Sequence, residues 1–277
     1  MSAPLPDLLP APDAAIAAPV RKKARGRANT LRIWVPAGFL ILLAFACFIW
    51  PQIYPVPKPV GGSILEAGLP PFSPGHILGT DPNGNDVLSR ILYGGQVSFE
   101  VGFSVTAIGL VIGGLLGMAA GYWRGITDTS IMRVLDVLIA FPALVLALAI
   151  AEGLGPSESH VIWALAIREQ NFMLAARLSG TRGWRVIGRH VIPNILPQLM
   201  TFALLGFGIA IILEGALSFL GLGIPLPEPS WGSMIAQGQQ VLSATPEQAL
   251  IPSAFLFATV VSLNLLGDAL REVWGVR

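Results

Sequence analysis

The chain has 277 residues, of which 53% are hydrophobic and only 12% are charged. Because a soluble domain has about 25% charged residues, this composition excludes an ordinary soluble protein and favours a chain embedded in a lipid bilayer. The 17 basic and 16 acidic residues leave a net charge of +1, which provides no argument for a nucleic-acid partner.

The N-terminal part of the chain predicts a tail and one membrane helix. Residues 1–20 are rich in Ala and Pro without an apolar period, which is typical of disorder, and a basic cluster follows at 21–27. The apolar run at 33–50 is longer than the core of a signal peptide and has no small-residue cleavage site after it. We therefore expect a cytoplasmic tail at 1–32, held inside by the basic cluster, and an uncleaved transmembrane helix at 33–50. A nucleic-acid patch is the less favoured interpretation of the cluster.

Residues 51–97 predict an extracytoplasmic loop and a segment that leads into the next helix. The loop has many Pro and Gly residues and no long apolar run. Part of it resembles the start of a calcium loop, with Asp81, Asn83 and Asn85 at alternate positions. However, Asp86 stands where a calcium loop needs Gly, and an apolar residue stands where it needs a bidentate Glu. We therefore favour a turn in which Asp86 caps the helix that follows.

Residues 99–121 are long and apolar enough to span the bilayer, with one charge, Glu100, near the predicted outer end. Glycines recur every four residues on one face of this helix: Gly109, Gly113, Gly117 and Gly121. Glycines on one face let a second helix approach closely. We expect this face to pack inside a helical core; a direct role in a substrate path is the alternative.

Three further apolar runs predict membrane spans. They are residues 134–151, 196–213 and 249–267. In the first run Asp136 lies one turn from Arg133, so we expect it to pair near the interface rather than to act within the membrane. Glu214 follows the second run and is expected near the outer interface.

The sequence contains no motif for catalysis or metal binding. A P-loop, an HExxH motif, a nucleophile elbow and a Rossmann fingerprint are all absent, so we expect neither ATP hydrolysis nor other catalysis by this chain. His76, His160 and His190 share no ligand spacing, and no metal site is expected. The single cysteine, Cys47, cannot form an internal disulfide.

Residues 168–197 form a long polar connector between strongly apolar segments. Ala175 and Ala176 favour a short helix, and Gly180 can end or bend it. Arginines keep the connector at an aqueous surface: Arg177, Arg182, Arg185 and Arg189. Because it has no nucleophile, ligand set or phosphate loop, we expect it to function by contact with a partner.

The spacing of the connector is similar to the EAA signature of bacterial ABC importer permeases, E-A-A-x3-G-x9-I-x-L-P. Leu174, Ala175 and Ala176 are followed after three residues by Gly180, and after nine more by the sequence HVIP at 190–193. Two positions differ from the signature. Leu174 stands where the family has Glu, and His190, the first residue of HVIP, stands where the family usually has Ile.

Two further stretches extend the resemblance. Residues 78–102 and 214–235 are similar to segments of the peptide/nickel permease subfamily, with Asn85 in place of the usual Arg. Together the three stretches cover most of residues 76–235 in the order found in that family. On these motifs the chain resembles the permeases of dipeptide, oligopeptide and nickel importers.

The resemblance implies an all-α, polytopic membrane protein of the ABC importer permease type, with five full transmembrane helices plus one shortened crossing. Residues 98–277 would form the permease core, which contains a cytoplasmic docking loop at 168–195. The chain would lie in the bacterial inner membrane with both termini in the cytoplasm. The residues that would dock an ATPase are Leu174, Ala175, Ala176, Arg177, Gly180 and Arg182.

The resemblance also implies the partners and the solute. The chain would act with a second related permease subunit, two cytoplasmic ATPase subunits that hold ATP and Mg²⁺, and an extracytoplasmic binding protein; it would bind no cofactor itself. Peptides, nickel or a similar small solute would be imported. The alternative is a degenerate or ATP-independent membrane scaffold that does not itself transport.

The fourth crossing is too short. Only residues 161–167 are uninterrupted apolar sequence before the connector, whereas about 20 residues are needed to span the bilayer as a helix. Members of the family that the chain resembles usually have a complete helix here, and by that resemblance about 20 residues are absent near Ile167/Arg168. The positive-inside rule still requires the arginines of the connector to be cytoplasmic. We therefore expect a shortened or distorted crossing.

Overall fold

The computed structural model describes residues 27–123, 125–155, 157–168 and 192–274, and in these residues the protein is all-helical. Two isolated bridges, Ser73 with His76 and Thr80 with Asp86, are confined to the loop after the second helix. The helices are α1 (Arg27–Phe48), α2 (Trp50–Ile53), the 3-10 helix η2 (Ile64–Glu66), α3 (Val87–Trp123), α4 (Ile126–Ala140), α5 (Ala143–Leu154), α6 (Glu158–Arg168), α9 (Ile192–Phe219), α10 (Trp231–Gln240) and α11 (Glu247–Trp274).

Among the described residues, four helices are long and apolar enough to cross a membrane, and a fifth candidate is a bent pair. The four spans are Thr30–Ile53, Val87–Ala120, Leu196–Phe219 and Glu247–Trp274. The bent pair is α4 with α5. Helices suit a membrane because their backbone groups form hydrogen bonds within the segment, as hydrocarbon requires.

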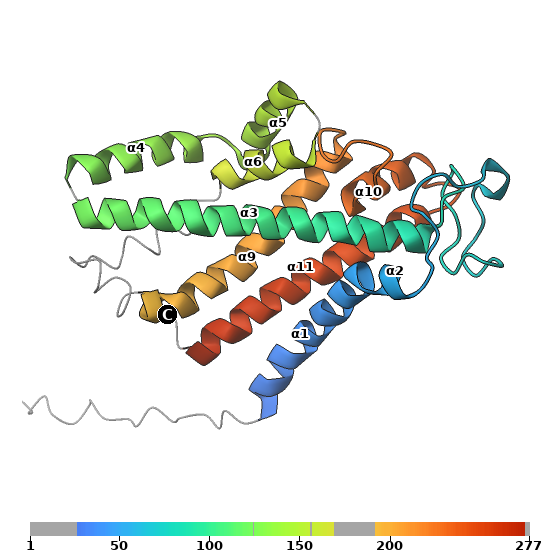
Figure 1. The fold of residues 1–277 in the computed structure, drawn as a ribbon, viewed down its shortest axis with the longest axis horizontal. Coiled ribbons are helices and arrows are strands. Elements are labelled where there is room, and N and C mark those ends of the chain that lie inside the picture. The colour runs from blue at the N-terminus through green and yellow to red at the C-terminus, as the bar shows by residue number, and fades with distance from the viewer. Residues whose placement is uncertain (1–26, 124, 156, 169–191, 275–277) are drawn as a thin grey trace, which may run out of the picture.

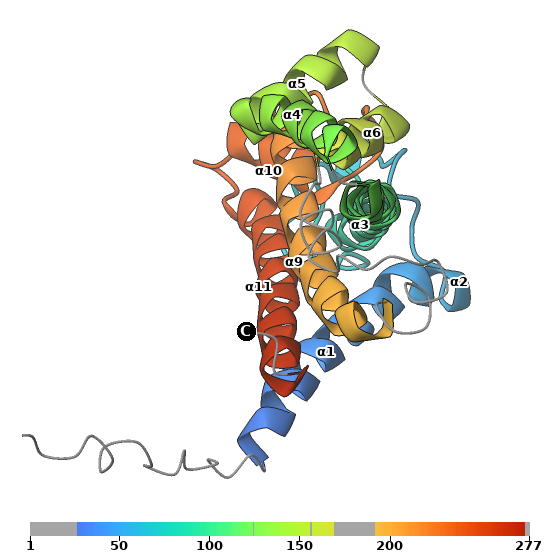
Figure 2. The same cartoon turned by 90° about the vertical axis from the view of Figure 1, so that its left-hand side faces the viewer.

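The long helices pack so that the described structure has two distinct ends (Figures 1 and 2). Helix α11 packs against α1, α9 and α10, and α3 packs against α1, α4, α6 and α9. The start of α1 and the end of α11 lie at the same end, where Arg32 forms an exposed ion pair with Glu272 at 3.6 Å. We call this the terminal end. The loop at 54–86 and helix α10 form a cap at the other end, the cap end.

Helix α3 joins the predicted short helix after Asp86 and the predicted span at 99–121 into one continuous helix. Ser89 N donates to Asp86 Oδ1 at 2.7 Å, which is the predicted helix cap, and the helix then continues for 37 residues. The predicted boundary between residues 97 and 98 therefore falls inside α3. At 1.5 Å per residue the helix is about 55 Å long, well beyond the roughly 30 Å of hydrocarbon. Likewise, α1 begins at Arg27, inside the segment predicted as a tail.

The predicted span at 134–151 falls on the bent pair, because the chain turns by 91° between α4 and α5, and it stays a candidate as a broken span. Phe141 has an extended backbone, with φ −83° and ψ 134°, and Pro142 follows it as the N-cap of α5. A residue before proline is disfavoured in the helical region because the proline ring clashes with it. The bend is thus a local consequence of the Phe-Pro pair.

Helix α6 is short but well buried. Its 11 residues are about 16 Å long, and Val161, Ala164 and Leu165 are almost completely excluded from solvent. They pack in a core shared by α3, α5, α6 and α9, which consists of Val101, Val105, Ala147, Val161, Leu165, Ala210, Leu217 and Ile224. Helix α6 therefore packs against both α3 and α5.

Candidate functional site

The predicted docking residues lie outside the described residues. The set is Leu174, Ala175, Ala176, Arg177, Gly180 and Arg182, all within 169–191. Helix α9 begins at Ile192, directly after this segment, and runs toward the cap end. The docking assignment therefore stays a prediction from the sequence.

Three of the four regularly spaced glycines of α3 are buried. They are Gly109, Gly113 and Gly117, and the surroundings of Gly121 lie outside the described part of the chain. Leu115 and Leu116, on other faces of the same helix, are exposed. This arrangement agrees with a packing face, and the role of the face is a proposal.

Two glycines nearer the cap end allow closer approaches that the sequence analysis missed. A Cβ added to Gly95 would lie 2.5 Å from Cys47 Sγ of α1, and one added to Gly102 would clash with the ring of Phe207 of α9. In the sequence, both positions place a residue of low helix propensity inside an apolar helix. This was the feature that could have indicated the close approaches. These glycines let α3 approach α1 and α9.

The cap is organised by a buried carboxylate, Asp81. Its Oδ1 accepts hydrogen bonds from the backbone N–H groups of Asn83 and Asn85 at 2.8 and 2.9 Å, and its Oδ2 accepts from Asn85 Nδ2 at 2.9 Å. Arg90, only 3% exposed, places Nη1 3.2 Å from Asp81 Oδ2 and donates from Nη2 to Gln237 Oε1 at 3.2 Å. The segment that resembled a calcium loop is thus a turn. Its Asp81 carboxylate accepts hydrogen bonds from amides of the same turn and pairs with Arg90.

Further hydrogen bonds hold the cap together and fasten it to α11. Within the loop, the backbone N–H of Gly62 donates to Asn85 Oδ1 at 2.9 Å, and Gln248 at the start of α11 donates to the carbonyl of Thr80. A polar pocket of about 470 Å³ lies within the cap, between the loop and α10. It is lined in part by Asn83, Asn85, Arg90, Gln237 and Gln240. No cluster of three His, Cys, Asp or Glu residues suited to a metal ion occurs in the described residues.

Glu214 is completely buried within α9. Its expected position near the outer membrane interface stays a prediction. The helix continues to Phe219, so Glu214 lies more than one turn inside it. Ser98 Oγ of α3 donates to Glu214 Oε2 at 3.0 Å, and Ser218 Oγ donates to Oε1 at 2.7 Å. The spacing of Glu214 and Ser218 by four residues was the one sequence indication of this contact. The network joins α3 to α9 near the cap end.

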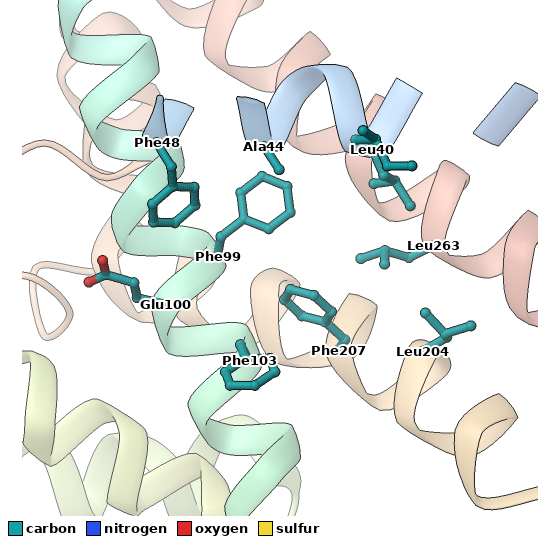
Figure 3. A pocket seen from close by; sticks show the side chains of 10 residues that line it. Leu40, Ala44, Phe48, Phe99, Glu100, Phe103, Leu204, Phe207 and Leu263 are labelled. Carbon is teal, nitrogen blue, oxygen red and sulfur yellow. The ribbon is translucent and has the colours of Figure 1, made fainter. Parts of the chain in front are cut away.

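An apolar groove of about 510 Å³ opens between α1, α3, α9 and α11 (Figure 3). Its lining residues are Leu40, Ile41, Ala44, Phe48, Phe99, Glu100, Phe103, Leu204, Phe207 and Leu263. The rings of Phe48 and Phe207 contact Phe99 edge to face, with centroid separations of 6.4 and 5.9 Å. Glu100 is the single charged residue in the lining.

Comparisons with known proteins agree on one family. Residues 161–274 match the model of the "Binding-protein-dependent transport system inner membrane component" family. A peptide transport system permease protein of Brucella suis is 36% identical over 264 residues, which cover 89% of this chain and 88% of that protein. The dipeptide transport system permease protein DppC of Alkalihalophilus pseudofirmus is 37% identical over 214 residues, covering 71% of this chain and 70% of that protein.

A third relative extends the coverage. The glutathione transport system permease protein GsiD of Pectobacterium atrosepticum is 34% identical over 258 residues, covering 86% of this chain and 85% of that protein. The family supplies membrane permease subunits and not catalysts. By the extent and identity of these matches, the chain belongs to the family of inner-membrane components of binding-protein-dependent transport systems, as a multi-pass permease subunit.

Proposed function

We propose that this chain is a permease subunit of an ATP-driven importer that carries short peptides delivered by an extracytoplasmic binding protein. The proposal rests on one observation. Relatives that align with most of the chain are named as permeases for peptide, dipeptide or glutathione transport. Glutathione is itself a short peptide, so these names agree on one chemical class. Nickel is the alternative solute that the sequence motifs leave open.

The proposed mechanism is alternating access. ATP binding closes a dimer of cytoplasmic ATPase subunits, the connector at 168–195 follows as a docked element, and the membrane helices of two related permease subunits change the side to which their cavity opens. In this assignment the terminal end is cytoplasmic and the cap end is extracytoplasmic. The basic cluster at 21–27 and the arginines of the connector favour this orientation by the positive-inside rule.

A shortened fourth crossing is supported by the lengths of the alignments. The 264 aligned residues of the Brucella suis relative include 89% of the 277 residues here, which is about 247, so about 17 aligned positions have no residue in this chain. The dipeptide permease gives the same difference, because 71% of 277 is about 197 against 214 aligned residues. We place this deletion after α6, whose 11 residues cannot span the bilayer.

The deletion favours a second candidate function. A permease that lacks half a crossing can occupy a complex without completing the transport cycle, as an ATP-independent scaffold. The two functions share assembly with partner subunits and differ in uptake, so one reconstitution separates them.

The test uses liposomes that contain this chain, a second permease subunit and the ATPase subunits, with the binding protein and a labelled dipeptide outside. The importer predicts ATP-dependent uptake, and assembly without uptake would establish the scaffold instead. Gly180→Val should abolish the coupling of ATP hydrolysis to uptake, because it forces a β-branched residue into the proposed turn. Ala176→Glu should reduce retention of the ATPase on co-purification, because a charge would enter an apolar contact.

A further inference from the structure

The apolar groove runs from near the cap end into the depth of the helical bundle. The chain directions of α1, α3, α9 and α11 place Phe48 and Glu100 toward the cap end, and Leu40, Leu204 and Leu263 deeper. Figure 3 shows the Glu100 carboxylate at one edge of the lining, on the side opposite Leu40 and Leu263. The groove thus has one charged end and is otherwise apolar.

The charged end lies near the expected membrane interface. Phe48 lines the groove, and the next turns of the chain carry Trp50 and Tyr54, which stack with a centroid separation of 5.7 Å and are exposed. Trp and Tyr are enriched where a membrane meets water. Glu100 is exposed and lies beside Phe48 in the same lining, so a carboxylate stands within reach of lipid head groups.

Glu100 is the single charged residue in the lining of the groove, and its carboxylate lies at one edge of that lining. The mouth of the groove is therefore complementary to a cation. An apolar channel beneath such a mouth fits a molecule with a cationic head and a hydrocarbon tail.

The groove is an open cleft of about 510 Å³, which can hold one flexible hydrocarbon chain. The rings of Phe99, Phe103 and Phe207 present apolar surface along its length.

We propose that this groove is a lipid site that holds one acyl chain of a phospholipid whose ammonium head group pairs with Glu100, of the phosphatidylethanolamine class. The lipid would fill the space between α1 and the α3–α9 pair and so fix α1 against the bundle. The proposal rests on the placement of the chain in a membrane and is independent of the transported solute.

The first test adds phosphatidylethanolamine that carries a photoreactive acyl chain to the full chain, alone and with its partner subunits. We expect the cross-linked peptides to contain Phe103 or Leu204, and unlabelled phosphatidylethanolamine to compete. Phosphatidylglycerol, which has no ammonium, should compete less well. Cross-links spread evenly over exposed positions such as Leu115 and Val111 would overturn the proposal.

The second test compares variants by the lipid that native mass spectrometry finds retained. Ala44→Trp should fill the groove from α1 and lower retention, whereas Leu115→Trp, at an exposed position outside the groove, should not. Glu100→Gln should lower the preference for phosphatidylethanolamine over phosphatidylglycerol by up to about fivefold, as expected for an exposed ion pair. Unchanged preference in Glu100→Gln would contradict the head-group assignment.

The alternative occupant is a side of a helix from a second permease subunit. Phe103→Cys in a Cys47→Ala background tests it by disulfide or bismaleimide cross-linking in the assembled complex. A cross-link from position 103 to the second subunit, without lipid labelling, would overturn the lipid site. Protection of that cysteine from lipid-soluble reagents by added phosphatidylethanolamine would support it.

Discussion

At the scale of single residues, buried carboxyl groups hold the cap and the bundle in place because each has hydrogen-bond partners. Asp81 receives backbone and side-chain amides and the guanidinium of Arg90. Glu214 receives the hydroxyls of Ser98 and Ser218. Removing one member of such a set costs more than the set contributes, because the remaining groups stay buried without partners.

Asp81→Ala should destabilise the protein strongly. Arg90, which is 3% exposed, would keep its charge without a counter-ion, at a cost of about 3–5 kcal/mol. Thermal unfolding in detergent measures the change as a lower melting temperature. The matched control is Glu66→Ala, because Glu66 is half exposed and lies 3.7 Å from His76, a contact worth at most about 1 kcal/mol. Equal shifts in the two variants would show that the Asp81 network does not hold the cap.

Glu214→Leu should lower stability more than Glu214→Gln. Leucine leaves the hydroxyls of Ser98 and Ser218 without an acceptor in a buried place, at about 1–3 kcal/mol for each unsatisfied group. Glutamine keeps one oxygen acceptor in nearly the same position. The yield of folded protein from membranes and its melting temperature report the difference. If leucine were tolerated as well as glutamine, the hydrogen-bonded link between α3 and α9 would be unimportant.

At the scale of elements, the sequence predicted where helices occur better than how they are arranged. The apolar runs located the spans within α1, α3, α9 and α11 because hydrocarbon allows few alternatives to a long apolar helix. The burial of Glu214 could not be predicted, because its partner Ser98 is distant in sequence and only the packing of α3 on α9 brings them together. Pro142 was a sequence indication of the bend after Phe141. The hydropathy of the surrounding residues nevertheless favoured one uninterrupted span.

The glycine face of α3 provides a prediction with a neighbouring control. Gly113→Leu should reduce the yield of folded protein in membranes, because Gly113 is buried and a leucine needs space where helices approach. Gly114→Leu should be tolerated, because a Cβ added at Gly114 meets nothing within 4 Å. Fluorescence of a fused reporter in detergent extracts measures both yields. Equal loss in the two variants would remove the argument for one special face.

At the scale of the whole molecule, the two ends of the bundle differ in structure. The cap end is a hydrogen-bonded loop domain with a polar pocket, and the terminal end carries the Arg32–Glu272 pair and the residues next to the connector. The motifs at 78–102 and 214–235, which carried the resemblance to the family, contain the residues of the Asp81 and Glu214 networks. The contacts of the connector stay a prediction, because residues 169–191 lie outside the described part of the chain.

The most direct measurement of the proposed arrangement is the side of the membrane on which the connector lies. A single cysteine is introduced at Thr181 in a Cys47→Ala background, and a second strain carries Leu65→Cys, at a position 92% exposed in the cap, as the outer control. An importer permease predicts that a membrane-impermeant maleimide labels position 65 in intact cells and labels position 181 only after the membrane is permeabilised. Labelling of position 181 from outside intact cells would contradict the account, because the connector could then not meet a cytoplasmic ATPase.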